Sequence, residues 1–146
     1  MKKIVALLGI LTLTVSCKTA NTATSNDSLK NAFKNKFYIG TAMSLPQIHE
    51  TEVKSVGIIK NQFSSIVAEN CMKSMFLQPQ EGKFFFDDAD QFVAFGEKNK
   101  MFIIGHTLIW HSQLPKWFFV DKDGKDVSQE VLKQRMKNHI TTVISR

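Results

Sequence analysis

Short apolar runs alternate with amphipathic segments along most of the chain, and this pattern predicts strands and helices in turn. Strands are predicted at 37–42, 63–68 and 101–107, and helices at 51–60, at 87–99 and from 129 onward. Strands that alternate with helices indicate βαβ units, and such units build a parallel sheet. The predicted fold class is therefore α/β, with about three β/α units.

Polar residues mark where two of these helices begin. Asp87 is predicted to cap the second helix, with Asp88 and Asp90 in the first turn, where acidic side chains are favourable. Ser128 is predicted to cap the last helix, and Glu130 follows in its first turn. The apolar stripe expected on this last helix comprises Leu132, Met136, Ile140, Val143 and Ile144.

The segment after the first strand bears on a rival fold. A small flavodoxin-like protein would show the same alternation of strands and helices. Gly40 is followed by TAMSLP at 41–46, which is not a glycine-rich phosphate loop. The sequence therefore weighs against a nucleotide site.

The first 16 residues have the pattern of a secretory signal. Lys2 and Lys3 precede an apolar core at 4–15, which is too short to span a bilayer as a helix. The residues TVSC at 14–17 resemble a bacterial lipobox. This resemblance implies export across the inner membrane and a lipid anchor at Cys17, on the periplasmic or cell-surface side. A plain signal peptide cleaved nearby is the alternative.

Residues 17–36 are rich in Thr, Asn, Ser, Ala and Lys and have no sustained apolar period. We interpret them as a tether that becomes weakly helical near 29–33.

Composition and charge are those of an ordinary globular protein, with 43% apolar and 22% charged residues. The 146 residues suffice for one domain, whereas a complete β/α barrel takes about 250. Without Lys2 and Lys3, 17 basic residues are interspersed with 13 acidic ones, so nucleic acid is not expected as a partner. With Cys17 assigned to a lipid, Cys71 has no disulfide partner, and we interpret it as a small buried residue rather than a nucleophile.

Polar side chains follow the second predicted strand directly. Glu69 and Asn70 could hold sugar hydroxyls, because each hydroxyl both donates and accepts a hydrogen bond. Lys73 lies four residues after Glu69, so a solvated Glu–Lys pair with Asn70 in a turn is the alternative.

Aromatic and imidazole side chains follow the third predicted strand. His106 and Trp110 share parity and could share a face, and a tryptophan ring suits the apolar face of a pyranose. Core positions for both residues are the alternative. His106 and His111 would face opposite sides of a strand, so no metal site is predicted. The aromatic runs at 84–86 and 117–119 are interpreted as packing between helices and sheet.

Three motifs taken together resemble glycoside hydrolase family 10: AENCMK at 68–73, QPQEGKF at 78–84 and GHTLIWHSQLP at 105–115. The resemblance implies that residues 37–146 are a partial catalytic domain, the N-terminal part of a TIM (β/α)8 barrel. Two positions depart from the family pattern, because Cys71 stands where an acidic residue is usual and Ser74 where a tryptophan is usual. We interpret these as variation that alters substrate preference at an outer subsite.

The resemblance also implies roles for six substrate-binding residues. It implies that Glu69, Asn70 and Lys73 hydrogen-bond the sugar next to the cleavage point, on its non-reducing side. His106 and Trp110 would line the subsite where cleavage occurs, and Gln113 would hydrogen-bond at the neighbouring subsite.

The activity implied by the resemblance is that of an endo-1,4-β-xylanase, which hydrolyses internal bonds of xylan with retention and needs no cofactor or metal. Such enzymes use an acid/base and a nucleophilic glutamate about 5–5.5 Å apart. The resemblance places both beyond Arg146, so no catalytic residue is assigned and this chain alone is expected to hydrolyse nothing. A glycan-binding module, an inactive barrel fragment and an enzyme completed by a second chain are the alternatives.

Overall fold

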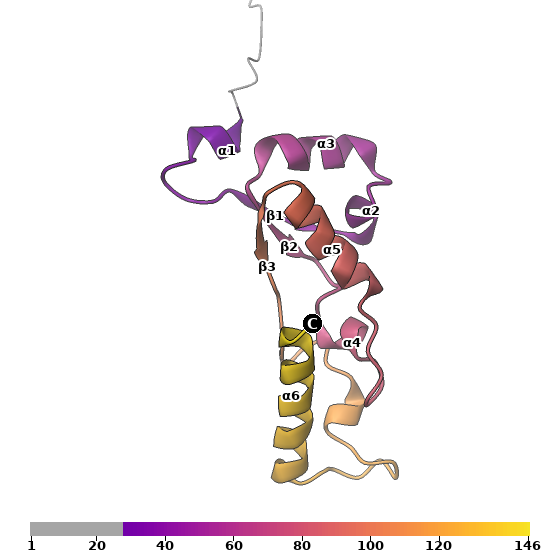
Figure 1. Cartoon of the computed structure of the whole chain (residues 1–146). Helices are drawn as coiled ribbons and strands as arrows, with labels where there is room; N and C mark the ends of the chain where they lie inside the picture. The colour runs from indigo at the N-terminus through magenta and orange to yellow at the C-terminus, as the bar shows by residue number, and fades with distance from the viewer. Residues whose placement is uncertain (1–27) are drawn as a thin grey trace, which may run out of the picture.

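The computed structural model describes residues 28–146 (Figure 1). The predicted signal peptide and Cys17 lie outside the described residues. In chain order the elements are α1 (Leu29–Ala32), β1 (Gly40–Met43), α2 (Leu45–Ile48), α3 (Val53–Gln62), β2 (Ser65–Ala68), α4 (Ser74–Leu77), α5 (Asp87–Lys98), β3 (Phe102–Ile104), the 3-10 helix η1 (Lys116–Phe118) and α6 (Gln129–Ile144).

The three strands form a parallel sheet in the order β1-β2-β3, as the alternating pattern predicts. Gly40 pairs with Ser65, which in turn pairs with Phe102. The third strand is shorter than the predicted range of 101–107. Val67 already pairs with Ile104 and β2 ends one residue later, so the chain beyond Ile104 has no strand left to pair with. Residues 105–115 form a loop that leads to η1.

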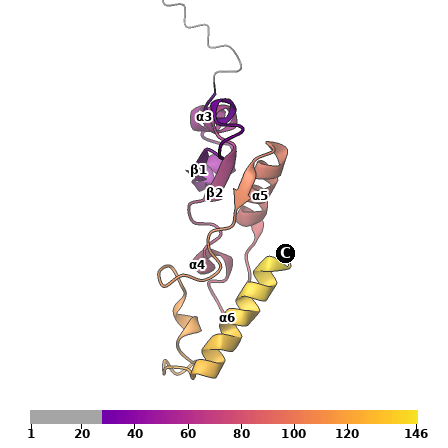
Figure 2. The same cartoon turned by 90° about the vertical axis from the view of Figure 1, so that its left-hand side faces the viewer.

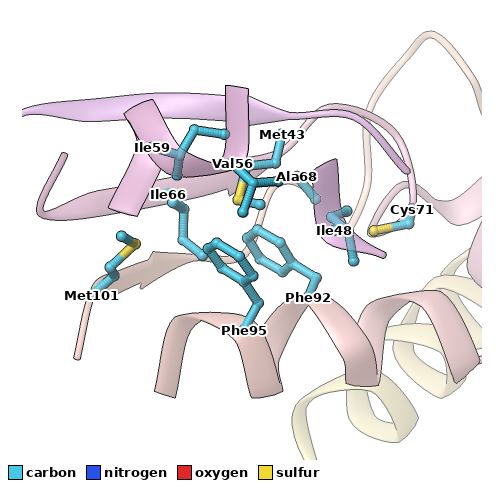
Figure 3. Close-up of a cluster of buried hydrophobic side chains, with 10 residues drawn as sticks. All are labelled: Met43, Ile48, Val56, Ile59, Ile66, Ala68, Cys71, Phe92, Phe95 and Met101. Carbon is cyan, nitrogen blue, oxygen red and sulfur yellow. The ribbon is translucent and has the colours of Figure 1, made fainter. Parts of the chain in front are cut away.

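Helices α3 and α5 pack on one face of the sheet and form the core with it (Figure 3). Phe92 and Phe95 point from α5 toward Ile66 of β2, and Val56 approaches from α3. Gly96 permits close approach of α5 to the sheet, because a Cβ built there would lie 2.5 Å from Cγ1 of Ile103. Apolar residues that recur at helical spacing in α3 and α5 thus form this core. The observed ends of both helices therefore lie within about two residues of the predicted ends.

The opposite face of the sheet carries no helix among the described residues. Phe102 and Ile104 point to this face, and 52% and 44% of their surfaces are exposed. Tyr38 stacks on the ring of Phe102 with a centroid distance of 4.9 Å. Exposed apolar surface of this kind marks a place where a protein makes further contacts.

Leu29 and Lys30, which the sequence assigns to the tether, contact α3. The backbone N–H of Leu29 donates to Oε1 of Gln62 (2.9 Å), and Nζ of Lys30 donates to the carbonyl of Lys60 (2.6 Å). These bonds hold α1 against the end of α3, so the short helix expected near 29–33 is part of the fold.

Helix α6 lies at the end of the molecule away from α1 and α3 (Figure 2). The predicted cap holds, because Oγ of Ser128 accepts from the N–H of Val131 (3.4 Å). The predicted cap at Asp87 is wrong: Phe86 occupies the cap position and Asp87 is the first residue of α5. None of the described helices is long and apolar enough to cross a membrane.

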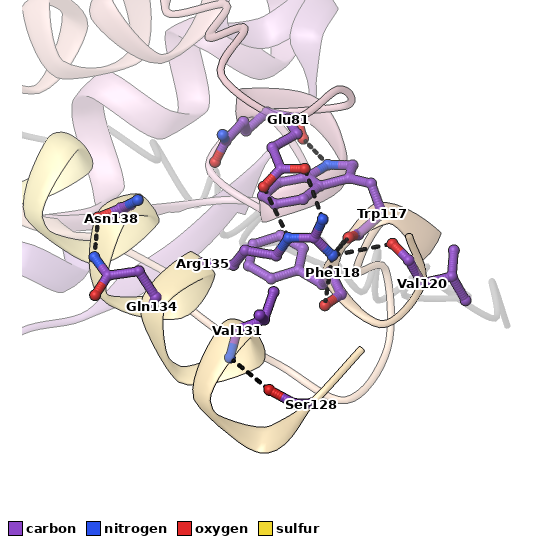
Figure 4. A network of polar contacts seen from close by, with 10 residues as sticks. Glu81, Trp117, Phe118, Val120, Ser128, Val131, Gln134, Arg135 and Asn138 are labelled. Atoms are coloured by element: carbon purple, nitrogen blue, oxygen red, sulfur yellow. Dashed lines mark hydrogen bonds and ion pairs between the residues drawn. The ribbon is translucent and has the colours of Figure 1, made fainter. Parts of the chain in front are cut away.

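Arg135 connects α6 to the loop before α5 and to the segment around η1 (Figure 4). Its Nε and Nη2 donate to the two carboxylate oxygens of Glu81 (2.7 and 2.8 Å). Nη1 donates to the carbonyls of Trp117 and Val120, and the guanidinium lies 5.8 Å from the Trp117 ring centre. One side chain thus joins α6, the loop before α5 and the segment around η1.

Candidate functional site

Two loops that leave the carboxyl ends of β2 and β3 meet beside the sheet. The loop after β2 carries Glu69, Asn70 and Lys73, and the loop after β3 runs from Gly105 to η1. The N–H of Met75 donates to the carbonyl of Gln113 (3.1 Å), which ties the two loops together. They meet because parallel neighbouring strands end at the same edge of the sheet.

Three of the predicted binding residues form a closed hydrogen-bonded cluster. Nζ of Lys73 donates to Oε1 of Gln113 (2.6 Å) and to Oδ1 of Asn70 (3.1 Å). Nε2 of Gln113 donates to the same oxygen of Asn70 (3.2 Å). The oxygen of Asn70 thus accepts twice, while its amide N–H groups donate to no other side chain or carbonyl within residues 28–146.

Two aromatic groups adjoin this cluster. Nζ of Lys73 lies 5.3 Å from the Trp110 ring centre, within the range of a cation–π interaction. The ring of His106 is tilted by 58° against that of Trp110, with centroids 6.0 Å apart. The edge of the half-buried Trp110 ring also meets the exposed His111 at 5.4 Å. Neither Trp110 nor His106 is a core residue, as the alternative interpretation would have required.

Glu69 stands apart from the cluster. Its N–H donates to the carbonyl of Met43 (2.9 Å), and its side chain is exposed. Within residues 28–146 it forms no ion pair with Lys73, because Lys73 turns toward Asn70 and Gln113 instead. The structure thus brings together five of the six predicted binding residues and leaves Glu69 at their edge.

Comparison with known sequences identifies the family of this fold and site. The sequence pattern of glycosyl hydrolase family 10 matches residues 28–146. The chain belongs to glycosyl hydrolase family 10.

Individual members of family 10 are similar to most of the chain. Endo-1,4-beta-xylanase A of Xylanibacter ruminicola is 45% identical over 139 residues, which are 95% of this chain and 37% of that protein. An intracellular xylanase of Thermoanaerobacterium saccharolyticum is 40% identical, with a TM-score of 0.76 over 81% of this chain and 37% of that one. A mutant of the latter, solved as a complex with xylotetraose, has a TM-score of 0.75 at 40% identity over 82% of this chain and 38% of that one. The chain therefore spans little more than a third of the length of these relatives.

Membership of family 10 explains the exposed face of the sheet. The solved family 10 structures are TIM barrels, and this chain matches their N-terminal part. In a barrel the face that carries Phe102 and Ile104 is the interior, which the remaining strands enclose. The predicted fold class, the N-terminal part of a (β/α)8 barrel, is confirmed.

Cys71, one of the two departures from the family 10 pattern, belongs to the core. Its side chain packs with Ile48 and Phe92, and burial, with a smaller effect of Asp88, raises the pKa of the thiol to about 11. A thiol that stays protonated at neutral pH is a poor nucleophile. Among residues 28–146 no group of three or more histidine, cysteine or acidic side chains could hold a metal ion.

Ser74, the other departure from the family 10 pattern, is part of a buried connection that the sequence interpretation missed. Its Oγ donates to the carbonyl of Leu108 in the loop after β3 (2.8 Å) and lies 3.2 Å from Nε2 of His139. Nδ1 of the fully buried His139 lies 2.8 Å from Oε1 of Gln78. Through Ser74, His139 of α6 thus supports the loop that carries His106 and Trp110.

Helical spacing contained a signal for His139. The residue lies three positions after Met136 and four before Val143, on the predicted apolar stripe of α6. The neighbouring stripe residues Met136 and Ile140 are only half-buried, whereas His139 is the buried residue of this helix.

We expect the stability of this family 10 chain to fall as the pH drops below about 6.5, the ordinary pKa of histidine. Burial lowers the pKa of His139, an effect that the nearby Leu108 backbone partly opposes. The unfolded chain therefore takes up a proton at a pH at which the folded chain does not, so the contribution is present above pH 6.5 and is lost as the pH falls toward the folded pKa. The urea concentrations at the midpoint of unfolding, compared at pH 7.5 and pH 5.5, measure this loss of stability.

The matched variant for this test is His139→Gln, which cannot titrate. It should be less stable at pH 7.5 and should show a smaller loss between the two pH values than the unaltered chain. An equal loss in both proteins would show that His139 does not cause the pH dependence.

Proposed function

We propose that this chain forms the sugar-binding part, next to the cleavage point, of an endo-1,4-β-xylanase that hydrolyses xylan with retention. The observation that carries the proposal is the cluster of Asn70, Lys73 and Gln113, which adjoins the Trp110 ring at the carboxyl ends of β2 and β3. In TIM barrel enzymes substrates bind at this end of the strands.

The chemistry of the cluster suits a pyranose. The ring oxygen and hydroxyls of the sugar can accept hydrogen bonds from the amide of Asn70 and the ammonium of Lys73. The sugar hydroxyls can also donate to Glu69. The Trp110 ring offers an apolar surface with an N–H at its edge, which matches the two sides of a sugar ring. Such contacts use binding energy to hold and distort the sugar, which lowers the barrier of the following reaction. The relative solved with xylotetraose supports a xylo-oligosaccharide as ligand.

The carboxylate content of the site supports a role in binding rather than in bond cleavage. Retaining hydrolysis needs two carboxyl groups about 5–5.5 Å apart. Glu69 adjoins the cluster, and its position matches a binding role. Asp88 lines a hollow together with Glu69 and Asn70 but is paired with His49. We therefore place the acid/base and the nucleophile outside residues 28–146, with the positioning residues Asn70, Lys73, His106, Trp110 and Gln113 inside. No metal or cofactor has a role in this scheme.

Replacing Lys73 with methionine should weaken xylotetraose binding by the full chain at least about tenfold, because the variant loses a charged donor and a link between Asn70 and Gln113. Titration followed by the indole N–H resonance of Trp110 measures the affinity. Lys133→Met, on the exposed surface of α6, is the matched control and should bind like the unaltered chain. Equal affinities of the two variants would contradict the assigned site.

A parallel assay separates binding from hydrolysis. Incubation of the chain with xylan, compared with a heat-killed sample, tests for release of reducing sugar. Binding without release would support the assignment above. Release above the control would place a complete catalytic pair within the chain and contradict it.

We also propose that the protein is exported and carries a lipid anchor at Cys17. The support is the sequence alone: two lysines, an apolar core at 4–15 and a lipobox-like TVSC. Labelling of expressing cells with a tagged fatty acid tests this, and incorporation should disappear in Cys17→Ala. Undiminished labelling of that variant would rule out Cys17 as the anchor.

A further inference from the structure

The positive charge of the chain is concentrated near its N-terminus. Residues 18–49 carry four lysines and a single acidic residue, Asp27. Residues 50–146, which include the candidate site, carry 13 basic and 12 acidic residues and are nearly neutral. The part of the molecule that carries the candidate site is therefore almost uncharged overall. The excess of positive charge lies in the N-terminal residues.

Three of these lysines form a patch at α1 and the loop after it. Lys30, Lys34 and Lys36, here called the N-terminal lysine patch, line a shallow hollow of about 390 Å³ together with Asn35, Phe37, Tyr38 and Ser64. Lys34 and Lys36 are exposed, and within residues 28–146 neither forms an ion pair. By contrast, Lys60 and Lys98 nearby are both paired with Glu50.

An exposed aromatic ring adjoins the patch. Phe37 is 58% exposed and stacks on Phe33 with a centroid distance of 4.8 Å, which gives the loop a defined shape. Phenylalanine together with lysines is typical of surfaces that lie at a membrane–water interface.

The patch lies at the opposite end of the molecule from the candidate site. In Figures 1 and 2, α1 lies at the top, where the described chain begins, while α4 and the segment after β3 lie below the sheet. A surface that holds the patch would therefore leave the site facing away from it.

We propose that the N-terminal lysine patch rests on an anionic lipid surface and orients the candidate site away from the membrane. The proposal rests on the proposed lipid anchor at Cys17. Ten residues separate Cys17 from Ser28, and the chain between them reaches at most roughly 40 Å. A connection of that length keeps α1 near the headgroups but does not by itself determine which side of the domain faces them.

Electrostatics determines that side. The surface potential of anionic lipids attracts each nearby lysine enough to strengthen binding about fivefold, and the attraction falls off within a Debye length of about 8–10 Å. Two lysines therefore contribute roughly 25-fold when they face the lipid and almost nothing when the domain is turned over. Residues 50–146 carry nearly equal numbers of basic and acidic residues, so their net attraction to the lipid is weak.

Vesicle partitioning of the full chain tests the proposal. The variant K34Q/K36Q should bind phosphatidylglycerol-containing vesicles about tenfold to thirtyfold more weakly than the unaltered chain, and the difference should shrink as salt is raised. Its matched control is K122Q/K125Q, two exposed lysines in the turn before α6, which should change binding less than about twofold. Because every protein carries the same leader, its contribution cancels in these ratios.

Several results would overturn the proposal. Equal vesicle binding by K34Q/K36Q and K122Q/K125Q would overturn it. So would an equally large loss of binding by K34Q/K36Q on vesicles of neutral phosphatidylcholine. If K34Q/K36Q kept its vesicle binding but lost retention on glucuronic acid-bearing xylan, the patch would bind an acidic polysaccharide instead.

A second measurement keeps this proposal separate from the sugar site. Xylotetraose binding by K34Q/K36Q should equal that of the unaltered chain. Loss of vesicle binding with intact sugar binding supports the patch, whereas absence of sugar binding in all proteins would contradict the proposed function without affecting the vesicle result.

Discussion

Replacing Phe92 with alanine should lower the free energy of unfolding by about 3–5 kcal/mol. The Phe92 ring is fully buried and lies between α5 and the sheet, where Ile66, Ile48 and Cys71 belong to the same cluster (Figure 3). The truncation removes apolar surface from the core and leaves a cavity that the neighbouring helices can only partly fill. Because the total stability of a domain is about 5–15 kcal/mol, this loss is a large part of what keeps the chain folded.

Urea unfolding followed by circular dichroism measures the effect, and Phe85→Ala is its matched control. Phe85 lies seven residues earlier and is 59% exposed, so its truncation should change stability by less than about 1 kcal/mol. Similar midpoints for both variants would show that α5 does not pack on the sheet as described.

The second large effect is expected for Arg135→Ala, at about 2–4 kcal/mol. The side chain is only 13% exposed, and its removal leaves the carbonyls of Trp117 and Val120 without a donor (Figure 4). It also leaves the Glu81 carboxylate without its bidentate partner. Hydrogen exchange should therefore speed up locally, between η1 and the start of α6, before the whole chain unfolds.

Glu81→Gln provides the control for Arg135. The Glu81 side chain is 53% exposed, so loss of this partly solvated pair should cost less than about 1 kcal/mol. If both variants destabilised the chain equally, the ion pair rather than the carbonyl contacts would hold α6 in place. Unchanged exchange at the N–H of Val127, which donates to the carbonyl of Phe119, would contradict the connecting role of Arg135.

The fold was predictable where local pattern and tertiary packing agree. Helix α3 buries Val56 and Ile59 of its apolar stripe and leaves Val53 exposed, while α5 buries its stripe against the sheet. The third strand was predicted too long because it was extended past the apolar run at 101–104 to Thr107, but strand length depends on a partner, and β2 ends at Ala68. Pairing partners are a property of the assembled sheet and are not encoded in one segment.

At the candidate site, too, some features were predictable from the sequence and others depend on the assembled fold. The residues that cluster there were found from the family resemblance, and strand order explains why two distant loops meet. Which side chains contact each other was not predictable from spacing: Lys73 pairs with Asn70 and Gln113, not with Glu69 four residues before it. The turn at 69–73 is not helical, so the spacing rule for helix faces does not apply to it. The support from His139 was missed because a histidine on an apolar stripe gives only a weak signal.

Gln113 combines its amide contacts with a backbone angle φ of 51°, in the left-handed region. For a residue with a Cβ this conformation costs roughly 1–2 kcal/mol, and glycine would adopt it almost without strain. Glycine would also remove the amide that joins Lys73 to Asn70. Selection for heat resistance and selection for sugar binding therefore favour different residues at this one position, and a library screened only for thermal survival should lose the glutamine first.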